Sequence, residues 1–527
     1  MSSHSSGQRA GKRSDMWERC DHTQFAPGPD WLGRIATPCW AQPMTYAATT
    51  FLLILTGGCM VGPKHTRPSA PVPPSYKEAP PDSWRQAQPK AAMPRGKWWE
   101  IYNDPQLNAL EEQVNISNQN VLLAEAQYRQ ARDQVRIARS ALFPLVSTTP
   151  SVTYSRNSGT VSTQLSGVNG QTTTVAVAVP PRTDYSLPVD VSYQADIWGN
   201  IRRTVVAAKQ TALSSDADLE NARLSFQAQL AEFYFELHGL DGDAALLQKT
   251  VASFQQYLQL TKDRFEAGVA SGGDVALAQT QLDTTRAQLI DIGVGRAQFE
   301  HAIAILIGKP PAQLTIPPSV LTTAPPPVPV GIPSALLERR PDIASSERLV
   351  AAANEQIGIA QSAFFPSLIL TATGGFETTN ITQWFTWPSR FWSLGPQLAQ
   401  TIFDAGKRRA QVDLQNSAYN ATVATYRQTV LTAFQQIEDQ MAALRILEQE
   451  AQAQDIAVRS ADKSLAITTE QYKAGTVDYL TVITTQSIAL ADQRTAVDIL
   501  TRRLTASVLL IEALGGGWDT SQLPKLW

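Results

Sequence analysis

Apolar residues recur every three or four positions along two long stretches of the chain. The first series is Val251, Phe254, Leu258, Thr261 and Phe265, and the second is Val423, Tyr426, Val430, Ala433, Ile437, Gln440, Leu444 and Leu447. This heptad spacing is typical of coiled-coil helices. No proline interrupts 199–268 or 406–475, so each is predicted to form a helix of about 100 Å. The sequence HGLDG (238–242) is where the first helix is expected to bend.

Shorter segments before each long stretch alternate between apolar and polar residues. The clearest is SLPVDVSYQ (186–194), and its expected partner is LVSTTPSVTY (145–154), across a loop rich in Ser, Gly and Thr. A second pair is expected from SLILTATGGF (367–376) and SLGPQLAQTIF (393–403). Alternation with period two predicts strands with one apolar and one polar face.

Aromatic residues gather in the loop of the second strand pair. They are Trp384, Phe385, Trp387, Phe391 and Trp392. Aromatic side chains at the ends of strands are typical of the interfacial girdle of a membrane barrel. The alternative interpretation is a local aromatic core beneath the loop.

Three motifs occur twice, in the same order. QVRIARSALFP (134–144) corresponds to QIGIAQSAFFP (356–366), DIWGNIRR (196–203) to FDAGKRRA (403–410), and RFEAGVASGGDV (264–275) to QYKAGTVDYLTV (471–482). Gly199 and Gly268 are 69 positions apart, as are Gly406 and Gly475. The interval before each first glycine is 55 residues in one copy and 40 in the other, which places 15 extra residues in the first copy's loop. The chain is therefore an internal duplication.

Two proline-rich stretches separate the copies from each other and from the N-terminal region. The predicted segments are an extension and signal (1–58), a lipid-anchored tether (59–97), the first repeat (98–323), a linker (324–333), the second repeat (334–518) and a tail (519–527). The strand pairs are expected at about 144–196 and 366–403. Proline-rich segments of this kind neither continue helices nor occupy sheet centres.

A cysteine follows the most apolar stretch near the start of the chain. Residues 47–55 are too few to span a bilayer but suit the core of an export signal. Gly57 and Gly58 precede Cys59, so the stretch resembles a lipoprotein box, although Thr56 stands where that pattern has Leu. The sequence therefore predicts a covalent lipid on Cys59. The alternative is a small buried cysteine after the signal.

Composition removes several classes of function. The 527 residues carry a net charge of −3, with no basic excess that would favour nucleic acid. Three cysteines do not make a disulfide framework. The five histidines are scattered, and no metal-binding, nucleophile or phosphate-binding motif is present. We therefore expect neither an enzyme nor a cofactor other than the lipid on Cys59.

Four strands per chain have two open edges. Unpaired backbone groups in hydrocarbon cost several kcal/mol each, so a membrane sheet must close. Bacterial barrels begin at about eight strands. Several chains are therefore predicted to contribute to one barrel, and the protein is expected to be an obligate oligomer.

The duplicated plan resembles a known family. The FP and DIWG/FDAG flanks of the strands, the glycine-containing helix turns and the ALGGGW ending (513–518) are similar to those of the TolC-like outer-membrane efflux ducts, the outer membrane factors. Within that family the chain looks like the NodT-type lipoprotein branch. The resemblance extends from Cys59 to about Trp518.

This resemblance implies a mainly α fold with a membrane β-barrel. Three chains would close a 12-stranded barrel continued by a coiled-coil helical barrel across the periplasm. The implied location is the outer membrane of a Gram-negative bacterium, and the partners are a periplasmic adaptor and an inner-membrane pump. The implied function is efflux of drugs or other small solutes. A type I protein-secretion duct and, less favoured, a periplasmic coiled-coil structural lipoprotein are the alternatives.

The helical turns are the implied working end of the duct. Gly268, Ser271, Gly475 and Thr476 lie in those turns and are predicted to meet the adaptor. The glycines would supply the backbone freedom that a reversal of direction needs.

A gate is expected beside the turns. Arg264, Asp274, Tyr472 and Asp478 would form a network that holds the tip closed, or would only solvate helix ends, and Leu480 would line the constriction. Relatives commonly have Arg at the position of Gln471 and an acidic residue at that of Thr484. The lost carboxylate would weaken any ring of charge that attracts cations and the salt-bridge part of such a lock.

Overall fold

A computed structural model describes residues 60–78, 96–156, 158, 163–166, 172–175, 180–328, 330 and 333–526. Cys59 and the signal segment lie outside these residues. The helices of the first copy are α2 Pro105–Ser117, α3 Gln119–Ser140, α4 Asn200–Glu266 and α5 Gly272–Leu306. Those of the second are α6 Leu336–Arg339, α7 Pro341–Ser362, α8 Lys407–Lys473 and α9 Tyr479–Ala513. Short 3₁₀ turns are η1 Trp98–Tyr102, η2 Pro311–Gln313, η3 Pro333–Ala335, η4 Ile381–Gln383, η5 Trp387–Ser389 and η6 Thr520–Gln522.

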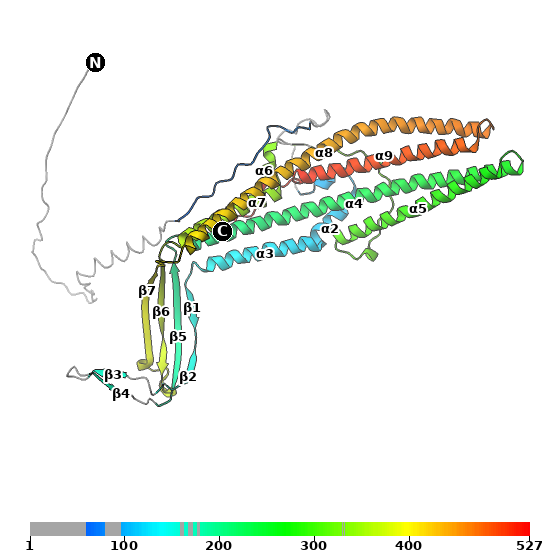
Figure 1. Cartoon of the computed structure of the whole chain (residues 1–527). Helices are drawn as coiled ribbons and strands as arrows, with labels where there is room; N and C mark the ends of the chain where they lie inside the picture. Colours follow the sequence, from blue (N-terminus) through cyan, green and yellow to red (C-terminus); the bar gives the residue numbers. More distant parts are fainter. Residues whose placement is uncertain are drawn as a thin grey trace, which may run out of the picture. The chain divides into compact units, whose positions relative to one another are not determined.

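The main helices of the two copies have equal lengths. Helices α4 and α8 each contain 67 residues, α5 and α9 each contain 35, and α3 and α7 each contain 22. Each copy therefore forms a long helical hairpin, as Figure 1 shows for α4 with α5 and α8 with α9. The duplication and the two long helices predicted from the sequence are confirmed. None of the described helices is long and apolar enough to cross a membrane.

The strands form an antiparallel sheet in the order β1-β5-β6-β7. Their bounds are β1 Leu145–Thr148, β2 Ser151–Ser155, β5 Arg182–Ala195, β6 Ser367–Thr378 and β7 Arg390–Ala399. Strand β2 pairs with the half of β5 that β1 leaves free, so β1 and β2 make one interrupted edge. The sheet is therefore four strands wide, because β1 and β2 together occupy one edge position, and β7 forms the other edge (Figure 1). Both expected strand pairs are present.

Two details of the strands differ from the sequence prediction. Strand β7 lies at 390–399 instead of 393–403, because Ala399 pairs with Ser367, the first residue of β6. Residues beyond Ala399 have no partner strand there. The longer loop of the first copy also contains a separate hairpin, β3 Thr163–Ser166 with β4 Thr172–Val175. Its strands, TQLS and TTTV, contain one apolar residue each, which is too few to show a period of two in the sequence.

The register places unlike residues on the two faces of the sheet. Directly opposite residues of an antiparallel pair share a face. One face therefore collects Leu187 with Phe376, Val191 with Ala372, and Tyr193 with Leu370. The other face collects Asp184, Asp190 and Glu377, and Asp190 accepts a 2.7 Å hydrogen bond from the Thr373 hydroxyl. The predicted apolar and polar faces are confirmed.

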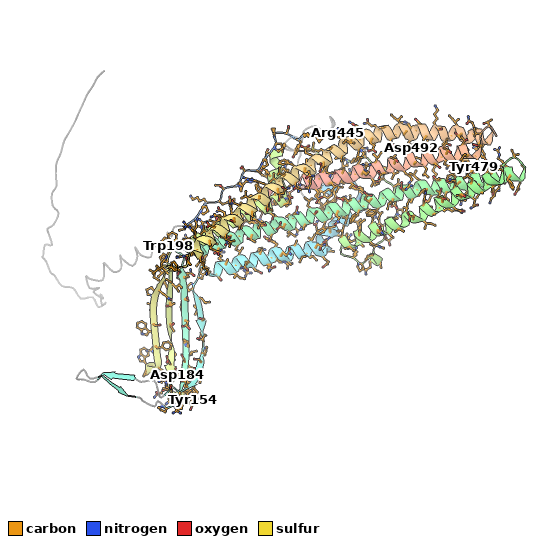
Figure 2. All side chains as sticks on the ribbon, in the orientation of Figure 1. Tyr154, Asp184, Trp198, Arg445, Tyr479 and Asp492 are labelled. Atoms are coloured by element: carbon orange, nitrogen blue, oxygen red, sulfur yellow. The ribbon has the colours of Figure 1, made fainter. Side chains whose placement is uncertain are left out.

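The DIWG and FFP motifs meet where the sheet joins the helices. The Trp198 ring stacks on Phe365 with centroids 4.6 Å apart, and Trp198 Nε1 donates to the Pro366 carbonyl at 2.8 Å. Gly199 then begins α4 with a positive φ of 80°, a conformation that favours glycine. Figure 2 labels Trp198 at this junction. The DIWG motif of the first copy therefore positions the residues that lead into strand β6 of the second copy.

Most of the predicted heptad positions are buried. Phe254, Leu258 and Thr261 are buried on α4, as are most of the predicted positions of α8: Tyr426, Val430, Ala433, Ile437, Leu444 and Leu447. The HGLDG segment leaves α4 unbroken. Its Gly239 allows close approach to α9, because a Cβ there would lie 2.5 Å from Thr501 Oγ1.

Residues 60–78 run against helices of both copies. Arg203 Nε donates to the Val61 carbonyl at 2.6 Å, and Arg203 also makes a buried 2.6 Å ion pair with Glu355 of α7. Further along, the Glu438 carboxylate accepts the backbone N–H groups of Lys77 and Glu78 at 2.7 and 2.8 Å. Polar contacts at both ends therefore hold this segment to the helices.

Candidate functional site at the hairpin turns

Both long helices end in the same backbone motif. Gly268 and Gly475 have φ values of 75° and 82°. Val269 N–H donates to the Arg264 carbonyl and Thr476 N–H to the Gln471 carbonyl, each at 2.9 Å. This is the Schellman arrangement, in which a left-handed glycine lets the chain reverse after the last helical turn. The conformational role expected of the two glycines is confirmed, and both are exposed.

A separate apolar cluster joins the two hairpins near these turns. Its buried members are Phe254, Leu258, Ala278, Leu282, Tyr472, Tyr479, Val482 and Ile483. All four long helices contribute, and the Tyr472 and Tyr479 rings lie 5.6 Å apart. Tyr479, labelled in Figure 2, lies at the turn end of α9. The cluster makes the ends of the two hairpins one packed unit.

Arg264 crosses from the first hairpin to the second. Its Nη1 donates a 2.7 Å hydrogen bond to the main-chain carbonyl of Tyr472, and its guanidinium lies 4.8 Å from the Tyr472 ring centroid. The last carbonyls of a helix have no partner within the helix and carry its negative dipole end. Arg264 therefore stabilises the C-terminus of α8 from another helix. Tyr472 is also held through its hydroxyl, 3.0 Å from Thr261 Oγ1.

The two aspartates of the expected network bond within their own turns. Asp274 and Ser271 form a reciprocal capping box at the start of α5, with hydrogen bonds of 2.9–3.1 Å. Asp478 caps α9 by accepting the Thr481 N–H at 3.0 Å. Hydrogen bonds from Thr481 lower the pKa of the Asp478 carboxyl. Within one chain, the structure therefore joins Arg264 to Tyr472 but assigns both aspartates to helix capping.

The remaining predicted residues are exposed. Leu480 is 57 % exposed at the start of α9. Thr476 and Gln471 close the second turn through two hydrogen bonds, because the Thr476 hydroxyl also donates to the Gln471 carbonyl at 2.9 Å. Thr484 donates to the Leu480 carbonyl in its own helix at 2.8 Å. Neither residue supplies an ionic contact at the positions where relatives have charge.

Sequence reasoning did not single out two members of this site. Tyr479 is buried in the cluster, and burial raises the pKa of its hydroxyl. Tyr257 contacts the second hairpin, with its hydroxyl 3.1 Å from Thr469 Oγ1. Tyr479 belongs to the repeated motif. When the two copies are aligned, the first copy has Gly272 at this position, and this difference was the available signal.

The aromatic residues of the sheet divide into two groups. Trp384 stacks on Phe385 at 5.2 Å and packs against Tyr185 at 5.5 Å, which is a local cluster. Trp387 and Trp392 are instead 79 % and 82 % exposed. Each interpretation of the aromatic loop therefore describes some of its residues.

Comparison with known sequences decides the family. Residues 110–309 and 332–516 match the family described as outer membrane efflux protein, and together they make up well over half of the chain. The chain belongs to this family. The resemblance stated from its motifs is thereby confirmed, and the family is one of efflux proteins, not of enzymes.

Individual relatives agree over nearly their whole length. The chain is 32 % identical over 478 residues to the "Probable efflux pump outer membrane protein TtgC" of Pseudomonas putida, covering 90 % of this chain and 95 % of that protein. It is 29 % identical over 484 residues to "Outer membrane protein OprJ" of Pseudomonas aeruginosa, covering 90 % and 96 %. The outer-membrane location expected from the sequence is confirmed at the level of the family.

Solved structures confirm the fold class. The outer-membrane channel OprN matches with a TM-score of 0.77 at 26 % identity, over 87 % of this chain and all of that one. The outer membrane protein VceC of Vibrio cholerae matches with a TM-score of 0.72 at 26 % identity, over 80 % and 99 %. The mainly α fold with a membrane sheet is thus shared with outer-membrane channels.

Proposed function

We propose that this protein is the outer-membrane exit duct of a tripartite efflux system. The observation that carries the proposal is a sheet four strands wide with one apolar face and two open edges, followed in each copy by a hairpin of 67- and 35-residue helices. The apolar face suits lipid, and the face with Asp184, Asp190 and Glu377 suits a water-filled lumen.

Closure requires further copies of the chain. Strands β1 and β2 leave one edge unpaired within the chain, and β7 leaves the other. Three chains whose sheets are four strands wide give twelve strands, within the range of bacterial barrels. Detergent-extracted protein should therefore have the mass of a trimer by light scattering. A folded monomer at micromolar concentration would contradict the barrel.

The gate is assigned to the ends of the hairpins. The Arg264 bond to the Tyr472 carbonyl links the second hairpin to the first. We propose that this bond holds the duct closed and that exposed Leu480, at the start of α9, forms the apolar constriction. Because Gln471 and Thr484 carry no charge, this link is the one charged contact between the ends of the hairpins among the described residues. A hydrogen bond to a charged group contributes about 1.5–3 kcal/mol, which is enough to bias a two-state tip.

Adaptor contact is assigned to the same end. Gly268, Ser271, Gly475 and Thr476 are exposed, and all four lie in or beside the two turns. Because both turns have the same Schellman geometry, they offer the adaptor two similar docking shapes per chain. An inner-membrane pump would complete the assembly.

The N-terminal anchor is assigned to Cys59. Its neighbour Met60 packs against Gly199, and Val61 N–H donates to the Trp198 carbonyl at 3.1 Å. This puts the chain beside the junction between sheet and helices, where an acyl chain could enter the bilayer. Cys59→Ser should abolish labelling by a fatty-acid probe. Equal labelling of both proteins would contradict the assignment.

Small apolar or amphiphilic solutes are the proposed cargo. Relatives are named as antibiotic, toluene and solvent efflux pump outer membrane proteins. These names favour efflux over protein secretion, while the apolar sheet face opposes a purely periplasmic structural role. Deletion of the gene should lower the inhibitory concentration of several antibiotics or solvents, and the intact gene should restore it. An unchanged tolerance with loss of a secreted protein would favour the secretion duct.

A further inference from the structure

The apolar face of the sheet contains a hollow near its far end. Its volume is about 720 Å³, and its walls include Leu187, Val189, Gly374, Phe376, Arg390 and Trp392. Strands β5, β6 and β7 of one chain therefore build it without a partner. Strand β6 leaves the helices at Ser367 and β7 returns from Arg390, so Arg390 lies at the end away from the helices.

Gly374 lines the hollow, and the backbone does not require a glycine there. A Cβ at Gly374 would meet only ordinary contacts, the nearest being the Phe391 carbonyl oxygen at 3.8 Å. The adjacent Gly375 differs, because a Cβ there would collide with the Leu187 carbonyl. Gly375 therefore permits the sheet to pair, whereas Gly374 leaves space on the apolar face.

Arg390 gives this hollow a charged rim. It pairs directly with Phe376 and so lies on the apolar face, where it is the one charged residue among the described strand positions. The opposite face carries Arg182, Asp184, Asp190 and Glu377. Arg390 donates to the Trp387 carbonyl and its guanidinium lies over the Trp387 ring, but among the described residues it forms no ion pair with a carboxylate.

An arginine in this setting suits one class of ligand. Exposed Trp387 and Trp392 beside it are typical of the membrane interface, where the headgroups of lipids lie. Lipid phosphates are bound by basic side chains beside apolar grooves. We propose that the hollow is a binding site for an anionic phosphate-bearing membrane lipid, with the phosphate on Arg390 and an acyl chain over Gly374.

A second copy of this chain is a poorer occupant. Copies are expected to join along the open edges at β1, β2 and β7, whereas the hollow lies on the face between β5 and β7. The proposal rests on the membrane location assigned above, because only there would lipid cover this face. It goes beyond the duct function by assigning one lipid site to each chain.

The test measures lipid retained by the purified oligomer. Full-length protein is placed in nanodiscs of phosphatidylglycerol or phosphatidylcholine and extracted gently, and bound lipid is counted by native mass spectrometry. We expect the wild type to retain about fivefold more phosphatidylglycerol than phosphatidylcholine, which is the effect of one basic residue near a lipid surface. Arg390→Gln should remove this preference. Gly374→Leu should lower retention of both lipids about tenfold, as expected when roughly two methylene groups lose apolar contact.

Matched controls separate this site from general lipid binding. Arg182→Gln removes a charge from the same end of the sheet but from the other face, and Gly395→Leu fills open space on that face. Both should retain lipid like the wild type. If the leucine variant does not assemble, Gly374→Ala replaces it, because its Cβ meets no close contact. The alanine variant should lose less lipid than expected for leucine.

The outcomes distinguish this inference from the duct itself. A trimeric wild type that restores efflux but shows no lipid preference would overturn the lipid site alone. Equal losses in Arg182→Gln and Arg390→Gln would also overturn it. A wild type that forms no trimer would overturn both the lipid site and the barrel.

Discussion

The turn between α4 and α5 and the turn between α8 and α9 occupy equivalent places in the two copies, with the same left-handed glycine and the same closing hydrogen bond. Their side chains differ. Phe265 is 49 % exposed, while its counterpart Tyr472 is 3 % exposed. Arg264 reaches across to the second hairpin, and its counterpart Gln471 makes no reciprocal contact.

The difference shows what duplication preserved and what it did not. Backbone geometry recurs because both copies need a glycine at the reversal. The side-chain contacts do not recur. A hydrogen bond between the two hairpins needs a donor on one of them and an acceptor on the other, so the two copies do not need the same residues. The second hairpin is consequently anchored on the first, through Tyr472, and the coupling depends on first-copy residues that have no equivalent in the second.

The largest difference in stability between equivalent positions of the two turns is expected between Tyr472→Ala and Phe265→Ala. Removing a buried aromatic side chain costs about 3–5 kcal/mol, whereas removal from a half-exposed site costs about 0.5–1 kcal/mol. Hydrogen exchange at residues 468–480 should therefore quicken strongly in the first variant only. Similar exchange in both variants would show that the second tip is not the more tightly packed one.

The helices before the sheet also differ between copies. Burial raises the pKa of Glu111 in α2 well above its ordinary 4.5, whereas the described residues of the corresponding region of the second copy form the short η3 turn and the four-residue α6. Above pH 4.5 the unfolded chain binds fewer protons than the folded one, so stability should fall as pH rises. The slope is about 1.4 kcal/mol per pH unit until the folded pKa is reached.

Glu111→Gln removes this titration. The variant should gain thermal stability relative to the wild type between pH 5 and pH 8. Glu112→Gln is the matched control, because Glu112 is exposed and pairs with Lys97. If the stability difference between Glu111→Gln and wild type stays constant across this range, Glu111 is not a buried proton-binding group.

The shared geometry of the turns predicts equal effects of valine at Gly268 and Gly475. Each substitution should cost about 1–2 kcal/mol of local strain, because valine disfavours positive φ. Trimer and protein level should remain near those of wild type while adaptor cross-linking and export fall. Gly293→Val, within helix α5 and in open space, is the control. Loss of the turn variants from the membrane would make the turns folding elements instead.

The smallest effect on stability is expected at Leu480, which corresponds to Gly273 in the first copy. Because Leu480 is exposed, Leu480→Ala should change stability by about 0.5 kcal/mol or less. Leak of a large antibiotic through the duct should nevertheless rise as the constriction widens. An unchanged leak would place the constriction elsewhere.

Sequence periodicity was sufficient for the backbone but not for the contacts at the tip. Glycine spacing predicted the ends of α4 and α8, and alternation predicted the pairing of β5 with β1 and β2. The Arg264 partner could not be predicted, since a main-chain carbonyl leaves no trace in residue identity. The capping role of Asp274 was readable from Ser271 three residues before it. The hypotheses for Cys59 and for adaptor docking stay predictions.

The central claim is that the first hairpin holds the second through Arg264, without a reciprocal contact from Gln471. Single-channel conductance of the reconstituted trimer tests this claim most directly. Arg264→Gln removes the charge that holds the Tyr472 carbonyl, while Gln471→Ala alters the equivalent position of the second copy. We predict that Arg264→Gln raises the ratio of open to closed time about tenfold or more, as loss of about 1.5–3 kcal/mol implies, and that Gln471→Ala behaves like the wild type. Wild-type conductance in Arg264→Gln, or an equal increase in both variants, would contradict the claim.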